Sequence, residues 1–224
     1  MCFVVITGTI PSELGLVQSL EWIVISSNRF SGMLPSELGQ LSNLLLLSMT
    51  DNEFEGLVPT ELGLLTSLEY LLTVRDNQLS GPIPSELGLL TNLTITLNFR
   101  NNQFSSTIPT QLGLLTNIQE LDFLNNQLTG PVPTEFGQLK AMGHLSVAQN
   151  DLTGTIPQEL SDLYQSLHTL NVEGNGQLSG IVPEALCALN GTCVGSSLDE
   201  CEGPFGLLFN CSSILCGCSC VCLG

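Results

Sequence analysis

The sequence predicts an α/β solenoid, a chain wound into a stack of similar coils, for three reasons. Prolines followed by a Glu-Leu-Gly-like triplet recur along most of the 224 residues, 24 to 26 residues apart. A short alternation of apolar residues precedes an Asn at a similar place in each interval. Aromatic residues make up only 5% of a chain that is 43% apolar, so Leu, Ile and Val must fill the interior. Such a period is typical of thin coils that bury a core between neighbours.

The prolines predict where each coil turns along its convex side. They are Pro11, Pro35, Pro59, Pro84, Pro109, Pro133, Pro157 and Pro183. Proline fixes φ and suits the first position of a short helix. We therefore expect a short helical or irregular segment after each proline, with the Leu of the triplet returning to the core.

The alternating apolar residues predict one short strand per coil. Alternation sends every second side chain inward, and stacking one strand per coil produces a parallel sheet, here along the concave face. A clear copy of the pattern comprises Leu20, Ile23, Ile25, Asn28, Phe30 and Gly32. The intervals Leu68 to Asn77 and Leu93 to Asn102 contain one extra residue, and the last coil contains one near Gly176. Each predicts a small bulge.

Two sets of repeated residues, one of Asn and one of Gly, are expected to be structural. The Asn side chains should satisfy backbone groups where the chain turns inward, because an amide both donates and accepts. This predicted ladder consists of Asn28, Asn52, Asn77, Asn102, Asn126, Asn150 and Asn175. Glycines follow where the chain must bend sharply, and Ser106 interrupts their series: Gly32, Gly56, Gly81, Gly130, Gly154 and Gly180.

The stretches LSGPIPSELGLLTNL and LTGPVPTEFGQL resemble the plant-type leucine-rich repeat, whose distinguishing second half is L-(S/T)-G-x-(I/L)-P. The resemblance covers about residues 4 to 186. It implies a right-handed horseshoe with a second small sheet after the Asn turn, near Gly81 to Ile83. Proteins of this type include receptor-like kinase ectodomains, polygalacturonase-inhibiting proteins and algal secreted proteins. The motif specifies the fold but no ligand.

We divide the chain into a solenoid, residues 1–186, with about seven to eight coils, and a cysteine-rich cap, residues 187–224. The chain enters the repeat pattern by Ile6, so we expect a leader and an N-terminal cap to be missing. Disulfides are expected in the C-terminal cap, although their pairing cannot be deduced. Metal binding and a lipid-modified or membrane-proximal tail are alternatives for its cysteines, which are Cys187, Cys193, Cys201, Cys211, Cys216, Cys218, Cys220 and Cys222.

Charge and hydropathy exclude several classes of partner. Asp and Glu number 21 against 4 Lys and Arg, and a formal charge of −17 repels nucleic acid and anionic lipid. The longest purely apolar run, Leu44 to Leu47, is far shorter than the roughly 18 to 20 residues of a membrane helix. Glycosylation sequons at Asn92, Asn190 and Asn210, together with the clustered cysteines, favour an extracellular or cell-surface location.

Candidate ligand-binding residues lie between the core leucines of the concave strands. Trp22 and Leu46 should share one column, joined by Tyr70, although Trp22 packing on an N-terminal cap is an alternative. Arg75 and Arg100 should stack on adjacent strands, neutralised by Asp51, Asp76 or Asp122, or by an anionic ligand. Polar residues follow toward the C-terminus, where we expect a solvated strip, comprising Glu120, Asp122, His144, Thr169 and Glu173, with His168 and Asn171 nearby.

These observations predict a non-enzymatic recognition module that binds a protein, peptide or carbohydrate on its concave face. We expect no catalytic residue, metal or cofactor there, because a flat open sheet offers no pocket that excludes water. Two alternatives are an inhibitor of a wall-degrading hydrolase and a structural protein of the wall or matrix.

Overall fold

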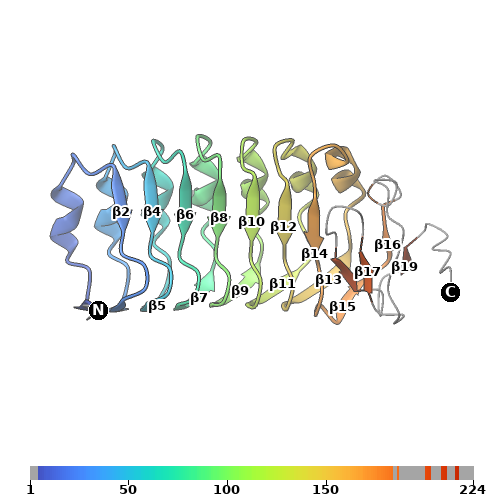
Figure 1. The fold of residues 1–224 in the computed structure, drawn as a ribbon, viewed down its shortest axis with the longest axis horizontal. Coiled ribbons are helices and arrows are strands. Elements are labelled where there is room, and N and C mark those ends of the chain that lie inside the picture. Colours follow the sequence, from blue (N-terminus) through green and yellow to red (C-terminus); the bar gives the residue numbers. More distant parts are fainter. Residues whose placement is uncertain (1–4, 184–185, 187–199, 203–207, 211–214, 217–224) are drawn as a thin grey trace.

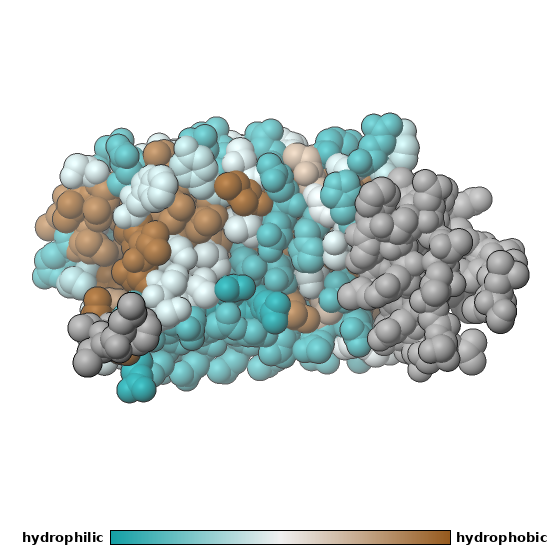
Figure 2. Space-filling view, viewed as in Figure 1, coloured by the Kyte–Doolittle hydropathy of each residue, from teal (hydrophilic) through white to brown (hydrophobic). Residues whose placement is uncertain are grey.

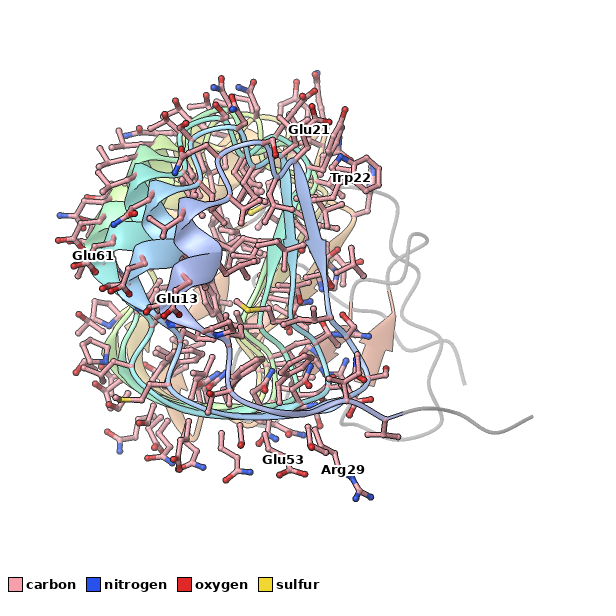
Figure 3. All side chains as sticks on the ribbon, turned by 90° about the vertical axis from the view of Figure 1, so that its left-hand side faces the viewer. Glu13, Glu21, Trp22, Arg29, Glu53 and Glu61 are labelled. Atoms are coloured by element: carbon pink, nitrogen blue, oxygen red, sulfur yellow. The ribbon has the colours of Figure 1, made fainter. Side chains whose placement is uncertain are left out.

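The computed structural model describes residues 5–183, 186, 200–202, 208–210 and 215–216, and Figure 1 shows them as an elongated stack of coils. Each full coil passes through a concave strand, a second strand and a short helix. Figure 3, seen from the N-terminal end, places the helices and the concave strands on opposite sides of the coil. The predicted solenoid with a helical convex side is thus confirmed.

The first sheet contains seven parallel strands of three residues each. In every strand the central residue is buried, and the register joins Leu47, Leu72 and Leu97 across neighbouring coils. We call the outward surface of this sheet the concave face. Its strands are β2 (Trp22–Val24), β4 (Leu46–Ser48), β6 (Leu71–Thr73), β8 (Thr96–Asn98), β10 (Glu120–Asp122), β12 (His144–Ser146) and β14 (Thr169–Asn171).

The second sheet has eight parallel strands, so it is not the small sheet that we expected. In the coil where Gly81 to Ile83 were expected to pair, the strand already begins at Gln78, directly after the Asn turn. The reason is that the turn at Asn77 brings the chain directly against the preceding coil, where Asn77 Oδ1 accepts a hydrogen bond from the N–H of Phe54. The strands are β1 (Thr7–Gly8), β3 (Arg29–Gly32), β5 (Glu53–Gly56), β7 (Gln78–Pro82), β9 (Gln103–Thr107), β11 (Gln127–Gly130), β13 (Asp151–Thr155) and β15 (Gln177–Ser179).

Between residues 5 and 183, seven 3-10 helices form the convex side, each starting directly after one of the repeated prolines. They stack closely because the Gly of the triplet lacks a Cβ. A Cβ on Gly63 would collide with the backbone carbonyl of Glu86 in the next coil. The helices are η1 (Ser12–Leu16), η2 (Ser36–Gln40), η3 (Thr60–Leu64), η4 (Ser85–Leu89), η5 (Thr110–Leu114), η6 (Thr134–Gln138) and η7 (Gln158–Leu163).

Four short strands follow the regular coils. β16 (Ile181–Val182) pairs with β19 (Leu215–Cys216) in parallel, and β17 (Glu200–Glu202) pairs with β18 (Leu208–Asn210) in antiparallel fashion. The side chains of the predicted cysteine cap lie outside the described residues, so the division at residue 186 remains a prediction. No helix within the described ranges is long and apolar enough to cross a bilayer.

The ladder Asn side chains join neighbouring coils, as Asn150 illustrates. Its Nδ2 donates to the carbonyls of Phe123 at 2.9 Å and of Val147 and Ala148 at 3.0 Å. Its Oδ1 accepts a hydrogen bond from the N–H of Leu128 at 2.9 Å. One amide therefore satisfies backbone groups of its own coil and of the preceding one.

The other Asn residues of the ladder repeat this arrangement wherever the described residues include the preceding coil. Asn52, Asn77, Asn102, Asn126 and Asn175 each donate to a carbonyl of the preceding coil. Within the described residues, Asn28 donates to Ile25 and Ser26 of its own coil and accepts from the N–H of Ile6.

The residue before each ladder Asn adopts a left-handed backbone conformation, a feature that we did not predict from the sequence. Non-glycine residues rarely do so, and Asp and Asn tolerate it best. The frequent Asp and Asn at this position were an available signal. The residues, with φ between 52° and 72°, are Ser27, Asp51, Asp76, Asn101, Asn125, Gln149 and Gly174.

Both bulges predicted in the middle of the solenoid fall just before a concave strand. One extra residue lies between the buried Leu68 and Leu72, and another lies between Leu93 and Leu97. The register of the core leucines continues through both coils. The insertions therefore displace only the residues that precede the strand, including Tyr70.

Candidate ligand-binding face

The concave face is divided into an apolar and a polar half. Figure 2 shows apolar side chains gathered over β2, β4 and β6, and hydrophilic ones over β8 to β12. The column before the central residue of each strand follows the same order, reading Trp22, Leu46, Leu71, Thr96, Glu120, His144 and Thr169. This surface therefore changes its chemistry along the solenoid while the backbone beneath it repeats.

The apolar half combines exposed and half-buried residues. Trp22 is 56% exposed and Val24 is 61% exposed, and Figure 3 shows Trp22 pointing away from the coil. The register of β2, β4 and β6 pairs Trp22 with Leu46 and Leu46 with Leu71.

Tyr70 therefore does not occupy the Trp22 column, contrary to the prediction. The extra residue of its coil places it one position before Leu71. Its ring nevertheless reaches back to Trp22, with ring centroids 6.1 Å apart at an interplanar angle of 59°. This distance lies within the range of favourable aromatic pairs.

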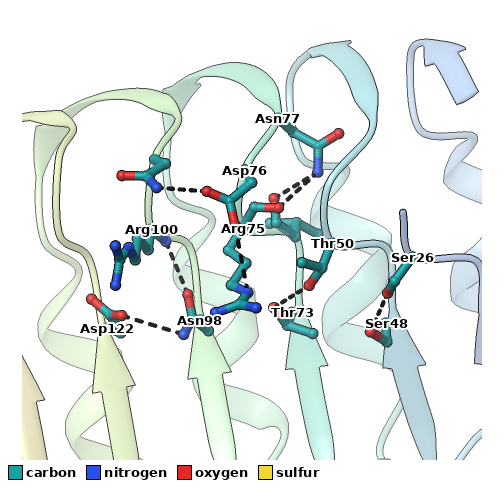
Figure 4. Close-up of polar contacts among 12 residues, drawn as sticks. Ser26, Ser48, Thr50, Thr73, Arg75, Asp76, Asn77, Asn98, Arg100 and Asp122 are labelled. Carbon is teal, nitrogen blue, oxygen red and sulfur yellow. Dashed lines mark hydrogen bonds and ion pairs between the residues drawn. The ribbon is translucent and has the colours of Figure 1, made fainter. Parts of the chain in front are cut away.

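Along the rim of the face, hydroxyl groups join neighbouring coils in pairs (Figure 4). The Ser26 and Ser48 hydroxyls lie 2.8 Å apart, and those of Thr50 and Thr73 lie 3.1 Å apart. The hydroxyls of each pair satisfy one another, and the two bonds stiffen this rim.

The two arginines of the face differ in their surroundings. Arg75 Nε lies 3.6 Å from Asp76 Oδ2, and its side chain is 47% exposed. Arg100 Nε is buried and has no hydrogen-bond partner among the described residues. Of the three acidic residues considered as counterions, only Asp76 forms an ion pair in the described part of the chain. The Arg100 guanidinium thus retains hydrogen-bonding capacity.

In the polar half, Glu120, Asp122 and His144 lie together. One possible ligand atom from each lies within 4.8 Å of the others. Asn98 Nδ2 lies 3.3 Å from both Glu120 Oε1 and Asp122 Oδ2, so one amide donates toward both carboxylates. Figure 4 shows Asn98 and Asp122 side by side on neighbouring strands.

The expectation of a solvated polar strip is wrong for Asp122, which follows the central residue of β10, whereas Asn171 at the same position of β14 is half-buried. Asp122 is 6% exposed, Asn98 is 6% exposed and Ser146 is 3% exposed. Strands of one sheet lie about 4.8 Å apart, so short polar side chains in adjacent coils cover one another. This face consequently contains buried polar chemistry.

The remaining predicted residues are scattered. Glu173 is exposed, and its N–H donates to Asn171 Oδ1 at 3.2 Å. Asn92 is exposed, and its Nδ2 donates to the Thr66 carbonyl at 2.8 Å. Asn190 and the side chain of Asn210 lie outside the described residues, as do the side chains of the eight cap cysteines.

A separate hollow of about 440 Å³ lies on the convex side between η6 and η7. Its lining includes Glu135, Glu159 and the Lys140–Asp162 ion pair of 3.1 Å. It contains none of the predicted ligand-binding residues.

Comparison with known proteins agrees with this architecture. A family model described as Leucine Rich Repeat matches residues 19–41, 94–115 and 117–139. A search of curated proteins by sequence finds no match.

Several solved structures are similar to the chain. One is the ectodomain of the membrane receptor kinase GASSHO1/SCHENGEN3 from Arabidopsis thaliana in complex with Casparian strip integrity factor 2. It is 37% identical over 80% of this chain and 21% of that chain, with a TM-score of 0.75. The Arabidopsis receptor kinase HAESA, in complex with the peptide hormone IDA and the co-receptor SERK1, is 33% identical over 81% and 30%, with a TM-score of 0.76. A TDR receptor is 34% identical over 82% and 31%, also with a TM-score of 0.76.

The fold and the repeated residues thus define a leucine-rich-repeat solenoid. Its repeats are of the plant type, as in the ectodomains of plant receptor kinases. The chain spans 21% to 31% of the length of these three structures.

Proposed function

We propose that this chain is an extracellular, non-enzymatic module that binds a peptide on its concave face. The observation that carries the proposal is the apolar group of Trp22, Val24, Leu46, Tyr70 and Leu71, followed along the same face by two arginines. In this group Trp22 and Val24 are exposed and the other three residues are half-buried. The two features together match a ligand with an apolar side chain and a separate anionic group.

The apolar group supports binding because contiguous exposed apolar surface is uncommon on monomers and frequently marks an interaction site. Trp and Tyr are also enriched among the residues that dominate binding energy. The Trp22–Tyr70 pair presents two rings that are already in contact, so little side-chain freedom is lost on binding.

The arginines support an anionic group on the ligand, such as a carboxylate. A guanidinium binds a carboxylate in a planar, two-pronged manner. Arg100 Nε has no hydrogen-bond partner among the described residues, and its coil adjoins that of Arg75 in the sheet. The strands β2 and β8 are separated by three strand spacings, roughly 15 Å, which an extended peptide covers with about five residues.

The similar structures support the class of ligand. The GASSHO1/SCHENGEN3 ectodomain is in complex with an integrity factor, and HAESA is in complex with a peptide hormone. Both are receptor kinases, which also favours an extracellular or cell-surface location for this chain.

The proposal is tested by presenting the immobilised chain with secreted peptides and with wall glycans. Binding of a peptide should fall at least about tenfold in Trp22→Ser, because burial of a large aromatic side chain supplies more than about 1.4 kcal/mol. Leu64→Ser is the matched control, since Leu64 is 60% exposed on the convex side. Retention of glycans would instead indicate a carbohydrate-binding module, and retention of one hydrolase would indicate a hydrolase inhibitor. If nothing is retained, a structural protein is indicated.

The arginines are tested separately. Arg75→Ala with Arg100→Ala should weaken binding of a peptide with a free C-terminal carboxylate or acidic residue, and the loss should shrink at high salt. Unchanged affinity in the double variant would remove the arginines from the site.

A further inference from the structure

We propose that Glu120, Asp122 and His144 form a binding site for a divalent transition-metal ion on the polar half of the concave face. The three residues come from the neighbouring strands β10 and β12, and the register pairs Glu120 directly with His144. The inference does not depend on the peptide-binding proposal, because it rests on a different group of residues.

The geometry suits a metal ion. One imidazole nitrogen and two carboxylate oxygens lie within 4.8 Å of one another. Ligand atoms about 2.1 Å from an ion are separated by roughly 3 to 4 Å, so small rotations of the side chains close the site. The strands hold the three Cα positions, and only side-chain torsions need to change.

The backbone turn after Asp122 does not require a charged side chain. Asp122 Oδ1 accepts a hydrogen bond from the N–H of Leu124 at 3.0 Å. Amide side chains make the equivalent bond in two other coils. Asn98 Oδ1 accepts a hydrogen bond from the N–H of Arg100 at 3.1 Å, and Asn171 Oδ1 accepts one from the N–H of Glu173 at 3.2 Å. A neutral amide is therefore sufficient for this turn.

The carboxylate of Asp122 is nevertheless almost fully buried, at 6% exposure, beside a second carboxylate. The ion pairs of the described residues are Arg75–Asp76 and Lys140–Asp162, so neither Glu120 nor Asp122 pairs with a Lys or Arg there. A buried carboxylate beside a half-buried one is unfavourable without a cation, and a bound metal ion reverses that balance.

A second, independent observation is the hydroxyl of Ser146. This residue is 3% exposed, and its Oγ has no hydrogen-bond partner among the described residues. Ser146 is the register partner of Asp122 and lies two residues after His144 on the same face of β12. A buried hydroxyl without a partner is costly, and a metal-bound water beside Asp122 would supply one.

The ligand set indicates the class of metal. Imidazole with carboxylates suits Zn²⁺ and related first-row ions, whereas Ca²⁺ and Mg²⁺ prefer oxygen ligands alone. Three protein ligands leave at least one position open toward solvent, and the ion would add positive charge to a protein with a formal charge of −17.

The experiment measures Zn²⁺ binding by titration calorimetry on the full chain, after alkylation of free thiols so that the nine cysteines do not compete. We expect one Zn²⁺ that Ca²⁺ does not displace. His144→Asn and Asp122→Asn should each weaken binding by about 100-fold, since even loss of a residue behind a metal ligand costs roughly 10 to 100-fold. Co²⁺ should give a visible spectrum without thiolate ligation, and His144→Asn should abolish it.

His168→Asn is the matched control, because it removes the other of the two histidines and should change affinity by less than about twofold. Circular dichroism checks that each variant is folded. Asp122→Asn should preserve the local turn, because Asn98 and Asn171 accept the equivalent backbone hydrogen bond in their coils. Equal Zn²⁺ affinity in the parent and His144→Asn, or equal losses in His144→Asn and His168→Asn, would overturn the site. Either result leaves the Trp22 binding test unaffected.

Discussion

The interior of each coil and its concave face follow opposite rules. Inside, the same Asn hydrogen bonds and buried leucines return from coil to coil. On the face, the register column changes from Trp22 to Thr96 to His144 within one uninterrupted sheet. Repeated residues therefore maintain the stack, whereas any preference for a ligand must come from residues that differ between coils.

Among substitutions in the interior, Gly63→Ala should lower stability the most. The added Cβ would meet the backbone of Glu86, which cannot move aside as a flexible side chain would. We expect the free energy of unfolding to fall by about 3 kcal/mol, measured by urea denaturation. Gly176→Ala is the control, because a methyl group added there would meet no atom of the described residues within 4 Å. Equal losses in both variants would contradict the close-packed helices.

Removal of a ladder amide should cost somewhat less. Asn126→Ala leaves the carbonyls of Phe99 and Phe123 and the N–H of Phe104 without their partner. We expect a loss of about 2 kcal/mol in the same measurement. Asn28→Ala should cost less, below about 1 kcal/mol, because the bond that its Oδ1 accepts from the N–H of Ile6 is exposed to solvent. An equal loss at Asn28 would show that burial of the bonds between coils is not the source of the effect.

One substitution in the interior should stabilise the protein. Ser106 has φ of 69°, a conformation that its counterparts in other coils adopt as glycines. Ser106→Gly should raise the free energy of unfolding by about 1 kcal/mol, because the left-handed strain of a Cβ disappears. Ser105→Gly, in the same strand, should lower it. A destabilised Ser106→Gly would mean that the serine side chain contributes more than its strain costs.

The face should be the least sensitive region in stability and the most sensitive in binding. Trp22→Ser should shift the free energy of unfolding by less than about 0.5 kcal/mol, because the side chain is 56% exposed. Thermal and urea denaturation of the variant check this. A loss above about 2 kcal/mol would indicate that Trp22 is structural and that the binding result needs another explanation.

Repetition explains how much of the fold was predictable. Prolines, core leucines and bend glycines recur with fixed spacing, so each copy supports the others. In the structure the prolines directly precede the helices, the leucines are buried, and the glycines adopt positive φ, mostly within the strands of the second sheet. The left-handed column before the ladder was missed although Asp51, Asp76, Asn101 and Asn125 mark it. The full extent of the second sheet was missed because its strands have no alternating apolar pattern of their own.

The face was only partly predictable, because contacts there join residues about 24 positions apart in sequence. A single inserted residue moved Tyr70 out of its expected column, yet the length of its side chain restored the contact with Trp22. The burial of Asp122 depends on neighbours in adjacent coils, and neither its own residue type nor its local pattern reveals it.

The unbroken strand register makes the solenoid a molecular ruler. Duplication of one coil between β6 and β8 would preserve the ladder bonds and the Trp22–Tyr70 contact but lengthen the path from Trp22 to Arg100 by about 4.8 Å. Loss of a coil would shorten it by the same step. Proteins built in this way adjust the length of ligand they accept in discrete increments of about one and a half peptide residues, without redesign of either end.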